Sequence, residues 1–206
     1  MLRTTRTLRA SLMTAAVLTT AVTLSACGST PPGANAPAAD SGSTSESTAP
    51  TEFNAADVDF AQMMIPHHEQ AVAMSNDLLA KQGTDPRVIA LATEIKAAQE
   101  PEITQLTDWL AEWGADTADT GGMSDMDHGT DGMMSEDDMM SLDKASGADA
   151  DQVFLKLMIA HHEGAIAMAQ THQDEGSNAD AHELSAAIIA SQSAEIEVMT
   201  GLLTAP

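Results

Sequence analysis

Two adjacent histidines occur twice in the sequence, each time between the same pair of methionines. In both copies one methionine precedes the histidines by three and four residues, and another follows them by seven and six. The eight residues are His67, His68, Met64, Met74, His161, His162, Met158 and Met168. Imidazole and thioether form a soft ligand set, which suits Cu(I) or Ag(I) better than Mg, Ca or Mn. A methionine stripe alone is more typical of a packed core, but beside paired histidines it favours a metal site.

Helical periodicity places these side chains on a face that would be buried. At about 100° per residue, Phe60, His67 and Met74 share one helix face, and the second copy repeats the arrangement. In the segment that follows, each copy has one Gln and one Glu among apolar residues: Gln99 and Glu102 in the first copy, Gln192 and Glu195 in the second. We regard these four residues and Met63 as candidate accessory ligands. Burying such groups without partners costs about 1–3 kcal/mol each. The alternative interpretation is that they hydrogen-bond one another and only fix the register of the helices.

The whole region around these motifs is duplicated. The second copy follows the first at an offset of 94 residues, which becomes 93 after the connecting turn. Each copy has two long segments of helical periodicity, which we place at about 57–81, 85–113, 149–175 and 178–203, with a kink at Pro66. Four long helices in two similar hairpins predict an all-α four-helix bundle. Its parts would be repeat one (57–113), a linker (114–148) and repeat two (149–203).

The linker between the copies is rich in methionine. Its other residues are mostly Asp, Gly and Ser, and Ser135 with the acidic residues after it resembles a helix start. We therefore expect a loop followed by a short helix, with Met139, Met140 and Leu142 on its apolar face. A solvated loop has no packing reason for so many thioethers, so we expect further accessory ligands here. They are Met123, Met126, His128, Met133 and Met134.

The charge of the chain excludes whole classes of partner. Its 206 residues carry 31 Asp and Glu against 8 Lys and Arg, a formal net charge of −23. Such a chain repels nucleic acid and attracts cations, so we expect metal ions and no nucleic acid as partners. The single cysteine excludes a disulfide framework and any cysteine-based zinc site.

The N-terminal segment is typical of a lipoprotein signal peptide. Basic residues in the first nine positions precede an apolar stretch at 12–24 that is too short to span a bilayer. Leu-Ser-Ala-Cys follows, which resembles the bacterial lipobox and ends at Cys27, the only cysteine. We expect a signal peptide over 1–26, lipidation of Cys27 and a disordered Ser/Thr/Pro/Ala-rich tether over 27–54. The bundle at 55–206 would then be anchored to a bacterial cell membrane on its extracytoplasmic side.

The doubled block resembles a known bacterial family. Phe-x-x-Met-Met-Ile-Pro-His-His-Glu-x-Ala-Val-x-Met begins at Phe60, and Phe-Leu-x-x-Met-Ile-x-His-His-Glu-Gly-Ala-Ile-x-Met begins at Phe154. Over about 57–203 the chain resembles the proteins grouped as domain of unknown function 305. The resemblance implies a ferritin-like four-helix bundle, secreted or lipid-anchored, with copper or silver binding in some members. Carried over to this chain, it marks the same eight His and Met residues as candidate ligands.

The spacing of the histidines and glutamates argues against two classes of metalloenzyme, the zincins and the di-iron oxidases. A zincin needs His-Glu-x-x-His, but Val72 stands four residues after His68, and Ile166 four after His162. A di-iron oxidase needs Glu three residues before a ligating His, and none of the histidines has it. We therefore expect no enzyme and no catalytic residue, but a protein that sequesters or passes on copper, with Cu(I) favoured.

Two interpretations from other classes remain open. One is a structural or adaptor bundle with a buried His/Gln/Glu network, and the other is a dinuclear-metal redox enzyme, which Glu102 and Glu195 keep open. His172 and His182 lie near the turn of the second hairpin, and we expect them to be surface residues or at most accessory ligands. The sequence leaves open whether the protein is a homo-oligomer.

Overall fold

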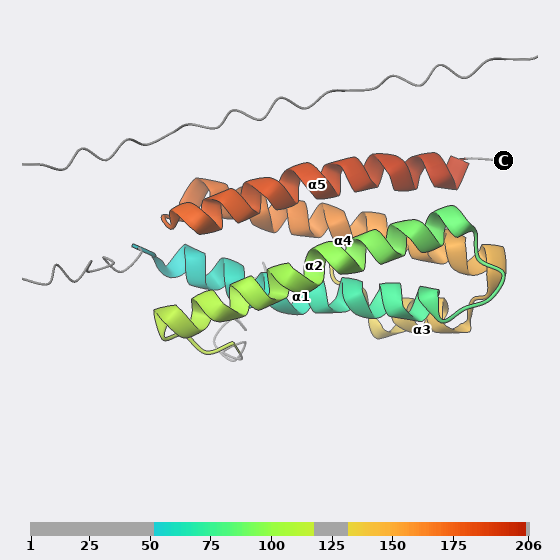
Figure 1. Cartoon of the computed structure of the whole chain (residues 1–206), viewed down its shortest axis with the longest axis horizontal. Helices are drawn as coiled ribbons and strands as arrows, with labels where there is room; N and C mark the ends of the chain where they lie inside the picture. Colours follow the sequence, from blue (N-terminus) through green and yellow to red (C-terminus); the bar gives the residue numbers. More distant parts are fainter. Residues whose placement is uncertain (1–51, 118–131, 205–206) are drawn as a thin grey trace, which may run out of the picture. The chain divides into compact units, whose positions relative to one another are not determined.

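Five helices form the described part of the molecule, which is known from a computed structural model over residues 52–117 and 132–204. In chain order they are α1 (Ala55–Leu79), α2 (Pro86–Trp113), α3 (Glu136–Lys144), α4 (Gly147–Glu175) and α5 (Ala179–Thr204) (Figure 1). The all-α prediction is confirmed, and each long helix begins and ends within two residues of its expected bounds. The expected signal peptide, Cys27, and the linker residues Met123, Met126 and His128 lie outside the described residues.

Local sequence sets the ends of the helices. The Asn54 side chain accepts a hydrogen bond from the Asp57 N–H at 3.1 Å, and the Asp57 carboxylate accepts one from the Asn54 N–H at 2.7 Å. This capping box begins α1, and Ser135 with Asp138 begins α3 in the same way, as expected. α2 ends at Gly114, whose φ of 69° is a left-handed conformation that favours glycine.

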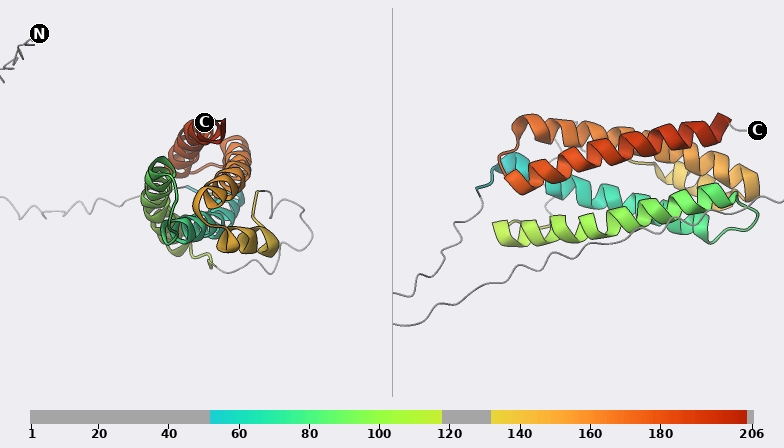
Figure 2. Two further views of the ribbon diagram at one scale, coloured as in Figure 1. Left: turned by 90° about the vertical axis from the view of Figure 1, so that its right-hand side faces the viewer. Right: turned by 45° about the horizontal axis from the view of Figure 1, so that its top comes forward.

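The two hairpins pack against each other through α1 and α4. α1 packs along α2, α4 packs along α5, and α1 and α4 run in opposite directions in contact with each other (Figure 1, Figure 2). α3 lies against α1 and α4, outside the four long helices. α1 remains one helix through Pro66. Because α1 and α4 carry the duplicated motifs, their antiparallel contact brings the two histidine pairs to the same level.

The buried core consists of two clusters of apolar side chains, one on each side of the histidines. The Met158 cluster comprises Ala71, Met74, Leu78, Val88, Leu91, Ala92, Ile95, Leu142, Ala150, Phe154, Leu155, Met158 and Met199. The Met64 cluster comprises Phe60, Ala61, Met64, Ile65, Leu106, Leu110, Ala165, Ala169, Leu184 and Ile188. The histidines therefore interrupt an otherwise apolar interior. Of the helices described, none combines the length and the apolar character of a membrane-spanning segment.

Candidate metal centre

The imidazole rings of His67 and His161 face each other in the middle of the bundle. Their ring centroids are 3.7 Å apart, the planes are tilted by 40°, and each residue is 1% exposed. α1 supplies one ring and α4 the other, so the two copies of the motif form one shared centre. None of the four ring nitrogens has a hydrogen-bond partner among residues 52–117 and 132–204. Unpartnered buried nitrogens cost free energy, so these four atoms make the pair a candidate ligand site.

The second histidine of each pair is held by a carboxylate from the neighbouring helix. His68 Nε2 lies 2.7 Å from Glu102 Oε2 on α2, and His162 Nε2 lies 2.6 Å from Glu195 Oε2 on α5. Because a carboxylate accepts hydrogen bonds, these contacts place the ring proton on Nε2 and leave the lone pair on Nδ1. Both Nδ1 atoms are buried and have no partner within the described ranges. A metal-ligating histidine usually donates its other ring N–H to a carboxylate or carbonyl, which fixes the orientation of the ring.

Two glutamines add polar groups at the same level of the bundle. Gln99 on α2 and Gln192 on α5 are both buried, between residues of one core cluster and residues of the other. Neither amide atom of Gln99 has a hydrogen-bond partner in the part of the chain described, and the same holds for Oε1 of Gln192. The expected His/Gln/Glu network therefore exists only as two separate His–Glu contacts.

The four candidate thioether residues lie on both sides of the histidines. Met74 and Met158 belong to the Met158 cluster, whereas Met64 lies in the other cluster with Met168 packed against it. Each side thus combines one methionine from α1 with one from α4. Met64, Met74 and Met158 are fully buried, while Met168 and the accessory candidate Met63 are partly exposed.

No three His, Cys, Asp or Glu side chains of the described chain are arranged to hold one metal ion. A third or fourth ligand to an ion at the histidines would therefore come from a methionine sulfur or a glutamine amide. Thioether donors accept soft monovalent ions and discriminate against Mg and Ca. The donor set of the centre thus fits Cu(I) or Ag(I), and it fits a hard cation poorly.

Burial keeps the facing histidines neutral. Burial, and then the neighbouring rings of His68 and His162, together lower the pKa of His67 to about 3. Burial, and then the neighbouring rings of His67, His162 and His68, together lower the pKa of His161 to about 2. The backbone of His67 opposes this shift but does not outweigh burial. Both imidazoles therefore keep a lone pair for a metal ion throughout the neutral and mildly acidic range.

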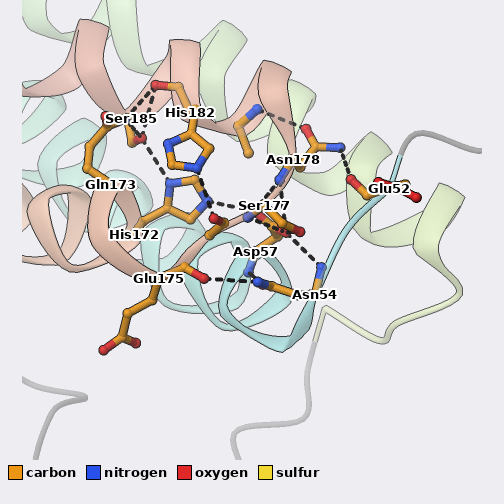
Figure 3. A network of polar contacts seen from close by, with 12 residues as sticks. Glu52, Asn54, Asp57, His172, Gln173, Glu175, Ser177, Asn178, His182 and Ser185 are labelled. Atoms are coloured by element: carbon orange, nitrogen blue, oxygen red, sulfur yellow. Dashed lines mark hydrogen bonds and ion pairs between the residues drawn. The ribbon is translucent and has the colours of Figure 1, made fainter.

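A fifth buried histidine, His172, corrects one of the expectations from sequence. It is 2% exposed, not at the surface, and it lies in a polar network at the N-terminal end of α1 (Figure 3). Its Nε2–H donates to Asp57 Oδ1 at 2.8 Å, and its Nδ1 is 2.9 Å from the Ser185 hydroxyl. The Asp57 carboxylate also accepts the backbone N–H groups of Ser177 and Asn178 at 3.1 Å. This network joins α1 to the turn between α4 and α5.

Hydrogen bonds outweigh burial at Asp57. Burial opposes its ionisation, but the bonds from Asn54, His172 and the turn residues hold the pKa of Asp57 below its usual value. The pKa of His172 is also lowered, because burial outweighs the opposing effect of Asp57. The network thus holds an ionised carboxylate beside a neutral imidazole, with each polar atom of the pair satisfied.

The duplication contains the signal that could have placed His172 correctly. At the offset of 94 residues its counterpart is Leu78, which lies on the buried face of α1 and is fully buried. His182 is partly buried, and its Nε2–H donates to the Gly176 carbonyl at 2.9 Å. Both histidines therefore have protein partners that a ligand would have to displace, which makes them poor accessory ligands.

The counterpart of Asp57 lacks such a partner. Asp151 accepts the Asp85 N–H at 2.9 Å at the start of α2, as Asp57 accepts the Asn178 N–H at the start of α5. Because Leu78 stands where the other copy has His172, Asp151 Oδ1 has no hydrogen-bond partner among the described residues. Burial, and then the charge of Asp85, raise the pKa of Asp151. Asp57 and Asp151 thus accept a backbone N–H at equivalent helix starts, but only Asp57 has hydrogen-bond partners for both carboxylate oxygens among the described residues.

Some of the linker methionines lie against the bundle and others do not. Met134 and Met139 pack against the Met158 cluster, and Met133 is partly buried. Met140 is 45% exposed, contrary to its expected place on the apolar face of α3, whereas Leu142 is fully buried there, as expected. A nine-residue helix lying on a bundle has room for a narrow buried stripe, so Met139 and Leu142, three residues apart, exclude Met140.

The comparisons with known proteins identify the family of the chain and agree with its fold. A family model for DUF305, a domain of unknown function, matches residues 57–203. The chain belongs to the DUF305 family. A presumed secreted DUF305 protein from Streptomyces coelicolor has 31% sequence identity and a TM-score of 0.68, over 72% of this chain and 91% of that one. A DUF305 fragment from Deinococcus radiodurans has 30% identity and a TM-score of 0.65, over 73% and 96%.

The protein CopM has the same fold. Its Cu(II)-bound structure has 31% sequence identity and a TM-score of 0.61, over 71% of this chain and 95% of that one. CopM has also been solved with Cu(I), at 28% identity and a TM-score of 0.57, and with Ag. No curated protein matches the sequence. A relative of this chain therefore binds the ions that its His and Met residues favour.

Proposed function

We propose that this DUF305 protein binds and handles soft monovalent metal ions, Cu(I) and Ag(I), through its buried histidines and methionines. One observation carries the proposal: six buried ring nitrogens of His67, His68, His161 and His162 have no protein partner within the described residues. Neutral imidazoles are metal ligands, and thioethers on both sides add soft donors. The metal is cargo to be sequestered or passed on, and no enzymatic step is needed.

The residues have distinct roles in this proposal. His67 and His161 supply the central nitrogens, and His68 and His162 offer Nδ1 because Glu102 and Glu195 hold their Nε2–H groups. Met64, Met74, Met158 and Met168 supply sulfur ligands. Gln99 and Gln192 stay accessory candidates, because both amide atoms of Gln99 and Oε1 of Gln192 are buried without partners in the described chain. Met63 and the linker residues Met123, Met126, His128, Met133 and Met134 also stay accessory candidates.

The purely structural alternative is weaker. A bundle that used its polar core only to fix helix register would pair those groups with one another, since a half-satisfied network costs more than an apolar core. At His67 and His161 no such pairing is present within residues 52–117 and 132–204. No observation favours the dinuclear redox enzyme.

The place of action follows from the N-terminal sequence. We propose that Cys27 is lipidated after removal of residues 1–26 and that the bundle faces the extracytoplasmic side of the membrane. The mature domain then has no thiol that an oxidising compartment could attack, and its thioethers bind Cu(I) without one. Mass spectrometry of the membrane fraction tests this: Cys27→Ser should lose the lipid mass and release the domain from the membrane.

The experiment for the metal site is a competition titration under anaerobic conditions. Purified domain competes for Cu(I) with a chromogenic chelator, in wild type, in His67→Gln/His161→Gln, and in a chain lacking residues 121–134. We expect the double variant to lose the tightest site and the deletion to keep it. Rigid helices bind with little ordering cost, whereas a loop must be ordered at about 1–2 kcal/mol per residue.

His182→Gln is the matched control, since it removes one imidazole outside the centre. It should leave the tightest site unchanged. If the deletion removes that site and the double variant keeps it, the ion binds to the linker and the proposal for the bundle core is wrong. Circular dichroism of each chain shows that the helices are retained.

A further inference from the structure

The segment that leads into α3 is attached to the bundle beside the histidines. Gln70, three residues after His67, makes two hydrogen bonds to the backbone of Met134. The Met134 N–H donates to Gln70 Oε1 at 2.7 Å, and Gln70 Nε2 donates to the Met134 carbonyl at 3.0 Å. A side-chain amide that pairs with one peptide unit in this way fixes the position of the backbone.

A second attachment point lies on α4. Gly132 has a φ of +84°, and a Cβ atom there would lie 2.6 Å from the Cα of Gly164 and 3.1 Å from the Ala160 carbonyl oxygen. Only glycine allows this approach, because both the conformation and the space exclude a side chain. Gly164 follows His161 by three residues and is the counterpart of Gln70 in the second copy. The chain thus crosses from α4 to α1 at the level of the histidines.

The same segment is attached at its far end. Leu142 of α3 is fully buried in the Met158 cluster, and Met134 and Met139 pack against that cluster. Lys81 Nζ, just after α1, donates to the Asp143 carbonyl at 2.9 Å. We call residues 132–144 the cover segment, since they lie over one side of the Met158 cluster.

The cover segment breaks the symmetry of the duplicated centre. Met74 and Met168 are counterparts at the offset of 94 residues. Met74, on the side of the cover segment, is fully buried, whereas Met168, on the other side, is partly exposed. The two thioether ends of the centre therefore differ in their access to solvent although their sequences are alike.

We infer that the cover segment seals the Met74–Met158 end of the centre, so that monovalent ions enter and leave through the Met64–Met168 end. The inference rests on the proposed function, because it assigns an exchange route to the same site. If the Met74–Met158 end is sealed, a competing ligand can reach the ion only from the Met64–Met168 end. Ion transfer by direct ligand exchange then begins at Met168, the only one of these four methionines that is partly exposed.

Methionine oxidation tests the seal without any metal. Metal-free protein is treated briefly with hydrogen peroxide, and each sulfoxide is measured by mass spectrometry. In wild type we expect Met168 to be oxidised fastest of the four and Met74 and Met158 to be protected. In Gly132→Ala and in Gln70→Ala, which detach the cover segment by different means, oxidation of Met74 or Met158 should rise several-fold.

Gly114→Ala is the matched control, because Gly114 also has a positive φ, +69°, but has nothing within 4 Å of an added Cβ. It introduces similar backbone strain and leaves the cover segment in place, so Met74 and Met158 should stay protected. Protection of both residues in folded Gly132→Ala and Gln70→Ala would overturn the inference.

Release of Ag(I) to a competing thiol tests the route. Both cover variants should release Ag(I) several-fold faster than wild type, while Gly114→Ala should not. If wild type holds no Ag(I) in the bundle, the proposed function fails whatever the oxidation pattern. If wild type holds Ag(I) but the cover variants release it at the wild-type rate, the proposed function stands and the exchange route is wrong.

Discussion

Two histidine sites in this bundle are equally buried but differ in their hydrogen-bond partners. His172 has a partner for each ring nitrogen, Asp57 for one and Ser185 for the other. His67 and His161 have none among the described residues, although they are just as deeply buried. Burial lowers the pKa of all three. The difference in partners therefore separates a site that stabilises the fold from the site that we propose binds a metal ion.

The free-energy consequences differ accordingly. A satisfied buried polar group adds modestly to stability, and removing its partner is costly, whereas an unsatisfied one lowers stability by about 1–3 kcal/mol. The Asp57–His172 network should therefore be sensitive to substitution, and the His67–His161 pair should be tolerant of apolar replacement in the absence of metal. Each prediction below acts on one side of this contrast.

The largest effect is expected at Asp57. Asp57→Ala removes the acceptor for His172, for the Ser177 and Asn178 N–H groups and for the Asn54 N–H. Leaving buried donors without their charged acceptor should lower the free energy of unfolding by about 3–5 kcal/mol. Denaturant unfolding measures this, with Asp57→Asn as a control that keeps one acceptor oxygen and loses less. A loss below that of an ordinary surface substitution would show that the network does not stabilise the fold.

The pH dependence of stability is the next largest effect. The unfolded histidines titrate at about 6.5, and the folded pKa is about 3 for His67 and about 2 for His161. Below pH 6.5 the unfolded chain therefore binds more protons than the folded one, and stability falls as the pH falls. Each group contributes about 1.4 kcal/mol per pH unit, so the two together lower the free energy of unfolding by roughly 3–4 kcal/mol from pH 7 to 5.

Denaturant unfolding of metal-free protein at several pH values measures this slope. His67→Gln/His161→Gln should make the slope shallower over the same range, since glutamine does not titrate; the lowered pKa of His172 still contributes in both proteins. Equal slopes in wild type and the double variant would mean that these two rings are not buried neutral groups.

A smaller effect of opposite sign is expected from apolar replacement at the centre. In metal-free protein, His67→Leu/His161→Leu removes four unpartnered nitrogens and should raise the free energy of unfolding by about 1–3 kcal/mol. The same variant should no longer be stabilised by Ag(I), whereas wild type should be. His172→Leu is the contrasting control and should be destabilising. If both leucine variants lose stability alike, the contrast between the two sites disappears.

The smallest effect is expected at the carboxylates that orient His68 and His162. Glu102→Ala/Glu195→Ala should weaken Cu(I) binding by about 10–100-fold, because the rings lose the partners that fix their tautomer. Glu102→Gln/Glu195→Gln keeps an acceptor oxygen and should lose less. Glu69→Ala, an exposed neighbour of His68, serves as the control. Unchanged affinity in the alanine variant would remove His68 and His162 from the ligand set.

Much of the fold was predictable because it follows from local sequence. The period of apolar residues and the breaks at the turns fixed four helices, and the duplication indicated two equal hairpins. Pro66 was less informative, since one missing hydrogen bond does not end a helix that packs on three others. The inward direction of His67 and His161 was predictable from the same periodicity, and the structure confirms their burial.

The meeting of the two histidine pairs was not predictable from spacing. It depends on α1 and α4 packing antiparallel through the same face, which is a property of the tertiary fold. Helix periodicity places His172 on the buried face, because it follows His161 by eleven residues, but its partner Asp57 is 115 residues away and could not be predicted from local sequence. Comparison with Leu78 at the repeat offset would have been a usable signal. The attachment of Gly132 to Gly164 had no sequence signature, because either glycine alone suits an ordinary turn or helix.

The most direct test of the central claim is nitrogen-15 NMR of the histidine rings during titration with Ag(I). The ring nitrogens of His67 and His161 should shift as the first equivalents bind, because their lone pairs coordinate the ion. The ring nitrogens of His172 should keep their metal-free positions, because Asp57 and Ser185 already occupy them. Binding of Ag(I) that leaves His67 and His161 unshifted would contradict the account, since the unpartnered nitrogens of the core would then not be the metal site.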